Sequence, residues 1–73
     1  MNRLLPIDID LWSAREIAAY LKVSPRQVTE RYAPLLDFPR PIRLPANKGN
    51  GHARWKASEI ITWAESRQEK KAA

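Results

Sequence analysis

Four prolines between Pro34 and Pro45 constrain the fold of this chain more than any other feature of its sequence. Proline lacks a backbone N–H, and its ring clashes with the preceding helical turn. This stretch therefore excludes a regular helix and disfavours a central strand. We expect a stiff connector here, with helices confined to the residues before and after it.

Two short runs of β type follow, one at residues 42–45 and the other at residues 52–55. Side chains alternate between the faces of a strand, so we expect an antiparallel ribbon with one apolar and one basic face. The expected apolar face comprises Ile42, Leu44, Ala53 and Trp55. The expected basic face comprises Arg43, His52 and Arg54. Its two arginines should lie opposite each other and clamp a phosphate.

Between Phe38 and Lys56 the sequence has five Lys or Arg residues and no acid. Residues 46–51, here called the wing loop, are polar, contain glycine and form a segment long enough to reach a groove of duplex DNA. The candidate contacts in this loop are Asn47, Lys48, Gly49, Asn50 and the backbone of Gly51. The alternative is a solvated hairpin whose charges only favour solubility.

A capping box marks the first helix. Ser13 can accept a hydrogen bond from the backbone three residues later, and Glu16 can reach back. The helix should run to about Leu21, with Ile17 and Leu21 on its apolar face.

A second helix begins one short turn later. Ser24 is a suitable N-cap, Pro25 suits the first helical position, and Gln27 would complete another capping box. This helix should run to about Ala33 and pack inward through Val28. Two capped helices so close together predict a helix-turn-helix corner.

Two positions depart from the usual pattern of that corner. The turn position often occupied by glycine is Lys22, where a left-handed backbone costs roughly 1 kcal/mol. The position that normally closes the apolar face is Arg31, so we expect Tyr32 to make that contact instead.

The two ends of the chain are simpler. Residues 1–10 should form an N-terminal arm in which apolar residues alternate with acids, as in an edge strand. Those apolar residues are Ile7, Ile9 and, just beyond the arm, Leu11. After Trp55, apolar residues recur at helical spacing and predict a last helix that ends near Gln68, with residues 69–73 frayed. The residues of that stripe are Ala57, Ile60, Ile61 and Ala64.

Length and charge limit the possible functions. Seventy-three residues predict one domain, 1–73, and a net charge of +5 favours a polyanionic partner. The chain has no Cys, which excludes disulfides and thiolate metal sites. We expect no enzyme, cofactor or metal, and we interpret Asp8, Asp10 and His52 as ordinary polar residues. Without an evident signal peptide or membrane span, the expected location is the cytoplasm.

Three tryptophans could suggest base stacking. Trp55 and Trp63 lie on apolar faces and are expected in the core, whereas the pattern does not place Trp12.

The order of these motifs resembles the small phage and prophage excisionases and the AlpA-type regulators, which share a MerR-like winged-helix domain. The likeness covers roughly residues 11–67. Its matching residues are Ile17, Ala18, Leu21, Val23, Ser24, Val28, Phe38, Pro39, Arg40, Pro41, Ile42, Arg43, Leu44, Arg54, Trp55, Ser58, Glu59, Ile60 and Trp63.

The resemblance implies an α+β, winged helix-turn-helix fold of three helices, with a two-stranded antiparallel wing between the second and third. It implies sequence-specific binding of double-stranded DNA by an excisionase, a transcriptional regulator or both. The partner could be an integrase or another phage protein, and the protein would be a monomer or weakly self-associating, cooperative on DNA. The wing loop is longer than usual and also resembles small terminase subunits, so a packaging role is the alternative. Binding to RNA would rest on charge alone.

The candidate base readers lie on the second helix, which in such proteins enters the major groove. Arg26 could bind guanine and Gln27 adenine through paired hydrogen bonds, and Glu30 could accept from cytosine or pair with Arg26. Other candidate contacts are Ser24, Thr29 and Arg31 on this helix, and Arg43, His52 and Arg54 on the ribbon. The alternative for the helix is an ordinary solvated face.

Overall fold

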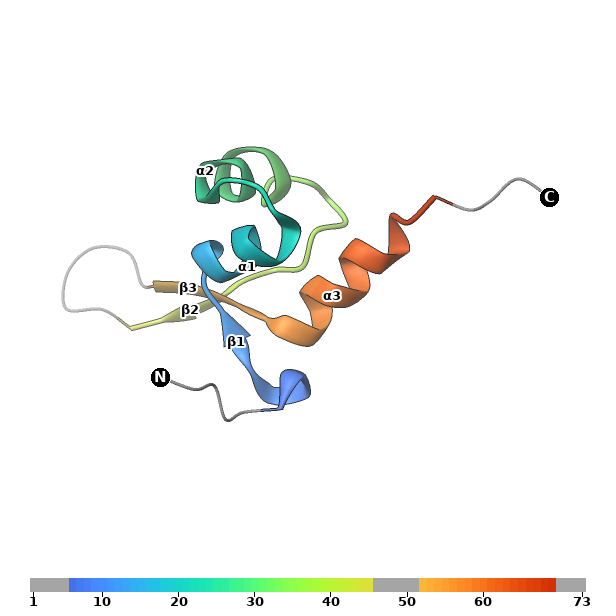
Figure 1. Cartoon of the computed structure of the whole chain (residues 1–73). Coiled ribbons are helices and arrows are strands. Elements are labelled where there is room, and N and C mark those ends of the chain that lie inside the picture. The colour runs from blue at the N-terminus through green and yellow to red at the C-terminus, as the bar shows by residue number, and fades with distance from the viewer. Residues whose placement is uncertain (1–5, 46–51, 70–73) are drawn as a thin grey trace.

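The computed structural model describes residues 6–45 and 52–69, and it has an α+β fold in which three α-helices accompany a three-stranded antiparallel sheet (Figure 1). The α+β class agrees with the sequence prediction. The elements are the 3-10 turn η1 (Ile7–Ile9), β1 (Leu11–Trp12), α1 (Ala14–Leu21), α2 (Pro25–Gln27), the π-helical segment η2 (Val28–Tyr32), β2 (Ile42–Leu44), β3 (His52–Lys56) and α3 (Ala57–Ser66).

The predicted capping box starts α1. The hydroxyl oxygen of Ser13 accepts a hydrogen bond from the backbone N–H of Glu16 at 3.3 Å, and the Glu16 carboxylate accepts one from the Ser13 N–H at 2.8 Å. The helix ends at Lys22, whose φ of 63° and ψ of 40° are left-handed. The expected left-handed turn is therefore present, and it turns the chain toward α2.

The second helix begins at Ser24, whose hydroxyl oxygen accepts from the Gln27 N–H at 3.1 Å. It continues from α2 into η2, where the Ala33 N–H donates to the carbonyl of Val28 at 2.8 Å. That bond spans five residues instead of four and widens the last turn. We call the continuous segment of residues 25–32 the second helix. Its extent agrees with the prediction to within one residue, but its π geometry was not expected.

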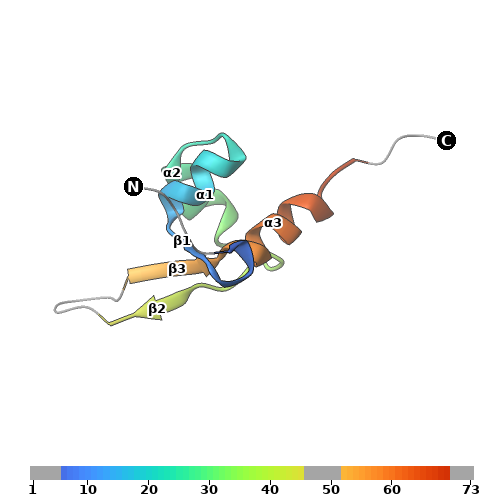
Figure 2. The ribbon, with the colours of Figure 1, turned by 60° about the horizontal axis from the view of Figure 1, so that its bottom comes forward.

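The sheet contains one strand more than predicted. Its strand order is β1-β3-β2, and β1 pairs with the C-terminal end of β3 through Leu11 with Lys56 and Trp12 with Trp55 (Figure 2). Two residues of the expected arm strand, Ile7 and Ile9, instead lie in η1 and are exposed. The strand β3 is therefore the middle strand, paired with β2 through residues 52–54 and with β1 through residues 55 and 56.

The faces of the ribbon formed by β2 and β3 also differ from the prediction. Ile42 lies opposite Arg54, and Arg43 lies opposite Ala53. Residues directly opposite in an antiparallel pair share a face, so the predicted separation into apolar and basic faces is wrong. A shift of one residue in register moves every side chain of a strand to the other face. The body side of the ribbon therefore carries Arg43 with Ala53, whereas Arg54 lies on the outer side.

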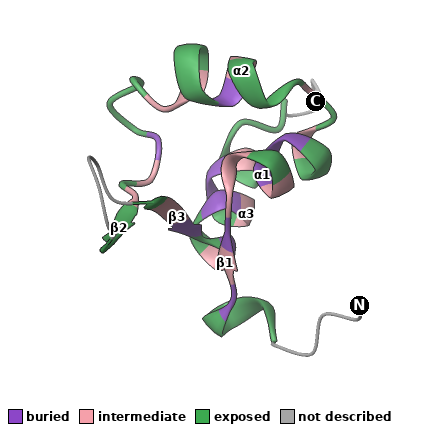
Figure 3. Cartoon of the chain, turned by 90° about the vertical axis from the view of Figure 1, so that its left-hand side faces the viewer, coloured by how far each residue is buried: buried purple, intermediate pink, exposed green. Residues whose placement is uncertain are grey.

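The core lies between the helices and the sheet, where the buried residues gather (Figure 3). Its residues are Trp12, Ile17, Ala18, Val28, Phe38, Trp55, Ala57, Ile60 and Trp63. Phe38, from the proline-rich connector, meets Trp63 edge-on with ring centroids 4.8 Å apart. The prediction that Trp55 and Trp63 are core residues is confirmed.

Asp10 is buried, and its carboxylate accepts from the Trp12 indole N–H at 3.2 Å, which places Trp12 in the core. The last helix ends at Ser66, two residues earlier than expected.

None of the helices within residues 6–45 and 52–69 has the length and apolar character needed to cross a membrane.

Candidate nucleic-acid interface

The outward side of the second helix gathers most of its predicted contact residues. We call this surface the helix face, and it consists of Ser24, Arg26, Thr29, Glu30 and Arg31, all exposed. Val28 is fully buried on the opposite side and fixes the rotation of the helix. Figure 3 shows this division, with green along the outside of the helix and purple where it faces the core.

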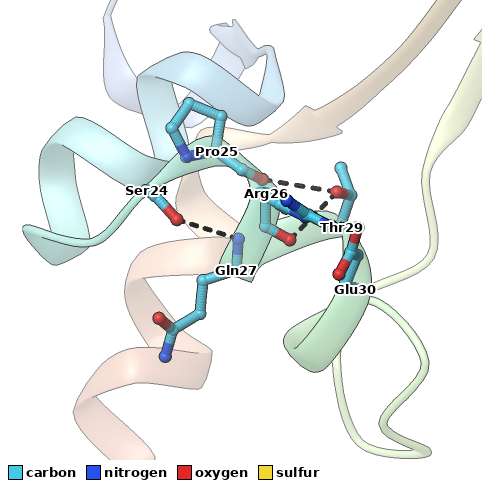
Figure 4. Close-up of polar contacts among 6 residues, drawn as sticks. All are labelled: Ser24, Pro25, Arg26, Gln27, Thr29 and Glu30. Atoms are coloured by element: carbon cyan, nitrogen blue, oxygen red, sulfur yellow. Dashed lines mark hydrogen bonds and ion pairs between the residues drawn. The ribbon is translucent and has the colours of Figure 1, made fainter.

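Arg26 and Glu30 form an ion pair on the helix face. The Nε of Arg26 donates to Oε2 of Glu30 at 2.9 Å, and the side chains are 82% and 59% exposed (Figure 4). A pair this exposed contributes little to stability. Its effect is geometric, because one edge of the guanidinium is bound and the donors on Nη1 and Nη2 stay available. Of the two roles expected for Glu30, the structure has the pairing with Arg26.

Gln27 makes a contact within the fold that the sequence did not indicate. Its side chain is half-buried, and its amide nitrogen donates to the hydroxyl of Tyr32 at 3.2 Å. In Figure 4 it extends away from Arg26 and Thr29. The predicted second capping box therefore lacks its Gln27 arm, and one of the two amide protons of Gln27 is engaged within the fold. The π turn, which the sequence did not indicate, brings the side chains of Gln27 and Tyr32 within hydrogen-bonding distance.

Thr29 uses its hydroxyl internally. The Oγ1 donor lies 3.1 Å from the carbonyl of Arg26 and 3.4 Å from that of Pro25 (Figure 4). Helical threonines commonly make such bonds to the preceding turn. The hydroxyl proton is therefore engaged within the helix, and the methyl group is the apolar part of this exposed side chain.

The ribbon holds its cations on two different sides. Arg43 is exposed on the side shared with Ala53, and that side faces the body of the molecule through Trp55. Arg54 is half-buried, lies on the outer side and donates from Nη1 to its neighbouring carbonyl, Ala53, at 2.8 Å. The predicted arginine clamp is therefore wrong. His52 is exposed near the end of the ribbon.

Five predicted contacts lie outside the described residues: Asn47, Lys48, Gly49, Asn50 and the backbone of Gly51. In Figure 1 the second helix and the ribbon lie toward one side of the molecule, whereas α3 leads away toward the other.

A groove of about 700 Å³ lies between α3 and the connector, and the sequence did not indicate it. Both signs of charge line it, with Asp37 and Glu59 among the acids and Arg40 and Lys56 among the bases. The Nε1 of Trp63, another lining residue, has no hydrogen-bond partner among the described residues. The carboxylates make this side less suited to a polyanion than the helix face.

No cluster of three or more His, Asp or Glu side chains suited to a metal occurs within residues 6–45 and 52–69.

A protein-family model with the description "Uncharacterised protein" matches residues 9–70. The chain belongs to this family. The matched segment includes β1, β2, β3 and all three α-helices, and so contains the helix face and the ribbon. Neither curated proteins nor solved structures gave a match.

Proposed function

We propose that this protein binds duplex DNA sequence-specifically as a winged-helix protein, with the second helix in the major groove and the ribbon along the backbone. The observation that carries the proposal is the position of Arg26. It stands in the first turn of a helix anchored by buried Val28, it is 82% exposed, and Glu30 orients its guanidinium. Residues near the start of a recognition helix are the ones that reach base edges.

Charge supports the same surface. The chain has a net charge of +5, and its longest acid-free stretch runs through the ribbon. Arg31 lies on the helix face, and Arg43 lies on the side of the ribbon that faces the helical body. These two cations would contact phosphates, which supply affinity and salt dependence but little sequence choice.

The best-supported biological role is that of a phage or prophage excisionase, a transcriptional regulator or both, acting in a bacterial cytoplasm. Support comes from the order of motifs in the sequence. A protein of this type would bind repeated sites cooperatively and position an integrase or another phage protein.

A second candidate role is the DNA-binding head of a terminase-like packaging subunit. The groove between α3 and the connector favours it, because a packaging subunit needs a surface for a protein partner in addition to its DNA contacts. The neighbouring gene separates the roles: an integrase gene supports excision, and a large terminase gene supports packaging.

The test is selection of binding sites from a library of random duplexes, followed by titration of the enriched duplex. We expect an enriched sequence that is bound at least about 10³-fold more tightly than random DNA. Arg40→Ala, which removes an equal charge beside the α3 groove, is the control and should leave the enriched sequence unchanged. Absence of any enriched sequence would refute sequence-specific binding.

A further inference from the structure

We infer that the helix face selects a guanine through Arg26 and a nearby thymine through the methyl group of Thr29, with Glu30 as the residue that positions Arg26. This inference rests on the proposed DNA binding, and it names the bases that the site recognises.

Glu30 favours one orientation of the Arg26 guanidinium. Glu30 accepts from its Nε at 2.9 Å, and both residues are held one turn apart on the same helix. The donors that remain are those on Nη1 and Nη2, a pair that points away from the bound edge. Guanine offers two adjacent acceptors in the major groove, O6 and N7, and arginine binds both at once. The carboxylate therefore favours one orientation of the guanidinium, in which the two-donor end is available to guanine.

Thr29 offers a different chemistry. Its hydroxyl proton is directed to the carbonyls of Arg26 and Pro25, and its methyl group offers an apolar contact on an exposed residue. Thymine is the base that carries a methyl group in the major groove, and apolar contact with that methyl distinguishes it. Arg26 and Thr29 lie three residues apart, so their Cβ atoms are roughly 5–6 Å apart along the helix. That spacing corresponds to one or two base steps.

The test uses the enriched duplex and replaces its bases one at a time. Substitution of 7-deazaguanine removes N7 alone, and deoxyuridine in place of thymidine removes the methyl alone. For the wild-type protein we expect one guanine whose replacement weakens binding by about tenfold, within the range for a bidentate contact. We expect one thymine, within two steps of it, whose replacement weakens binding about fourfold, the effect of one buried methyl-sized group.

Matched variants assign each base to its residue. In Arg26→Ala, the deazaguanine substitution should have no further effect. Thr29→Ser keeps the hydroxyl and its internal bond but removes the methyl, so it should be insensitive to deoxyuridine. Thr29→Val keeps the methyl and should stay sensitive. All of these side chains are exposed, and circular dichroism would verify that each variant is folded.

The role of Glu30 is tested by Glu30→Gln, which keeps the size of the side chain and removes its charge. A positioning role predicts a smaller deazaguanine effect, with unchanged or tighter binding to random duplex. An unaltered deazaguanine effect would show that Glu30 does not position Arg26. If the wild type has an enriched sequence but no base couples to Arg26 or Thr29, this inference is wrong while the proposed function stands. If no duplex is bound, both fail.

Discussion

The indole Nε1 of Trp55 donates a hydrogen bond to the carbonyl oxygen of Pro39 at 3.1 Å. This bond joins the ribbon to the proline-rich connector, 16 residues earlier in the chain. The ring of Trp55 is 4% exposed and meets Phe38 edge-on at 6.3 Å. The same strand pairs with β1 at Trp12, so one side chain links the connector, the sheet and the core.

Trp55→Ala should lower the free energy of unfolding by about 3–5 kcal/mol, the usual effect of emptying a buried aromatic site. A domain of this size has roughly 5 kcal/mol of stability, so much of the protein would be unfolded at room temperature. Trp55→Phe keeps most of the ring and loses the bond to Pro39, and should cost about 1 kcal/mol beyond the smaller ring. Urea unfolding followed by circular dichroism measures both.

Leu36→Ala, at a residue that is 92% exposed, is the control and should leave the midpoint of unfolding unchanged. A folded Trp55→Ala protein with normal stability but weak DNA binding would mean that Trp55 stacks on bases.

Lys22→Gly should stabilise the protein by about 0.5–1 kcal/mol. The backbone of Lys22 is left-handed, which costs a residue with a Cβ roughly 1–2 kcal/mol, and the greater freedom of glycine in the unfolded chain offsets part of the gain. Lys22→Ala, the control for the lost charge, should show no such gain. Ala19→Gly, at an exposed position inside α1, should instead destabilise by about 1 kcal/mol. If Lys22→Gly and Ala19→Gly change the free energy of unfolding in the same direction, this account of the turn is wrong.

Much of the helical part was predictable because its signals are local. The capping box of Ser13 and Glu16, the N-cap Ser24 and the left-handed Lys22 all act within a few residues, and all have the expected geometry. The positions of Trp55 and Trp63 followed from periodicity, which records which face is buried.

The ribbon could not be predicted to the same level, because its register depends on contacts that are distant in sequence. Alternation shows which residues of one strand share a face, but not which face of the partner strand they join. The bond between Trp55 and Pro39 is one such distant contact. The contact between Gln27 and Tyr32 was missed for a related reason, since it depends on the π turn.

Binding to duplex DNA should weaken steeply with salt. A plot of log affinity against log salt should have a slope of about −4 to −6, which corresponds to roughly five or six neutralised phosphates. Fluorescence anisotropy with a labelled duplex at several salt concentrations measures it. A slope near zero would remove the electrostatic basis of the proposal.

The two ribbon arginines should behave differently. Arg43→Ala removes a cation on the side facing the helical body, so it should flatten the salt slope by about one unit and weaken binding to specific and random duplexes alike. Arg54→Ala removes the same charge from the outer side, where Arg54 is half-buried, and should change the slope little. If Arg54→Ala flattens the salt slope more than Arg43→Ala does, the DNA lies on the outer side of the ribbon.

Arg26→Ala should behave unlike either ribbon variant. Loss of a base contact should cost about 1–3 kcal/mol on the enriched duplex and relax the base preference at one position. Random DNA should be affected much less. If Arg26→Ala weakens both duplexes equally, the second helix is not the element that reads sequence.

The most direct test of the central claim is nuclear magnetic resonance of the labelled protein titrated with the enriched duplex. We predict that the largest changes in amide chemical shift occur in residues 24–31 and in the ribbon strands, with small changes in residues 59–66 of α3. Changes concentrated along α3 and residues 36–42, with the second helix unaffected, would place the DNA in the groove of the protein between α3 and the connector. That result would contradict the proposed interface.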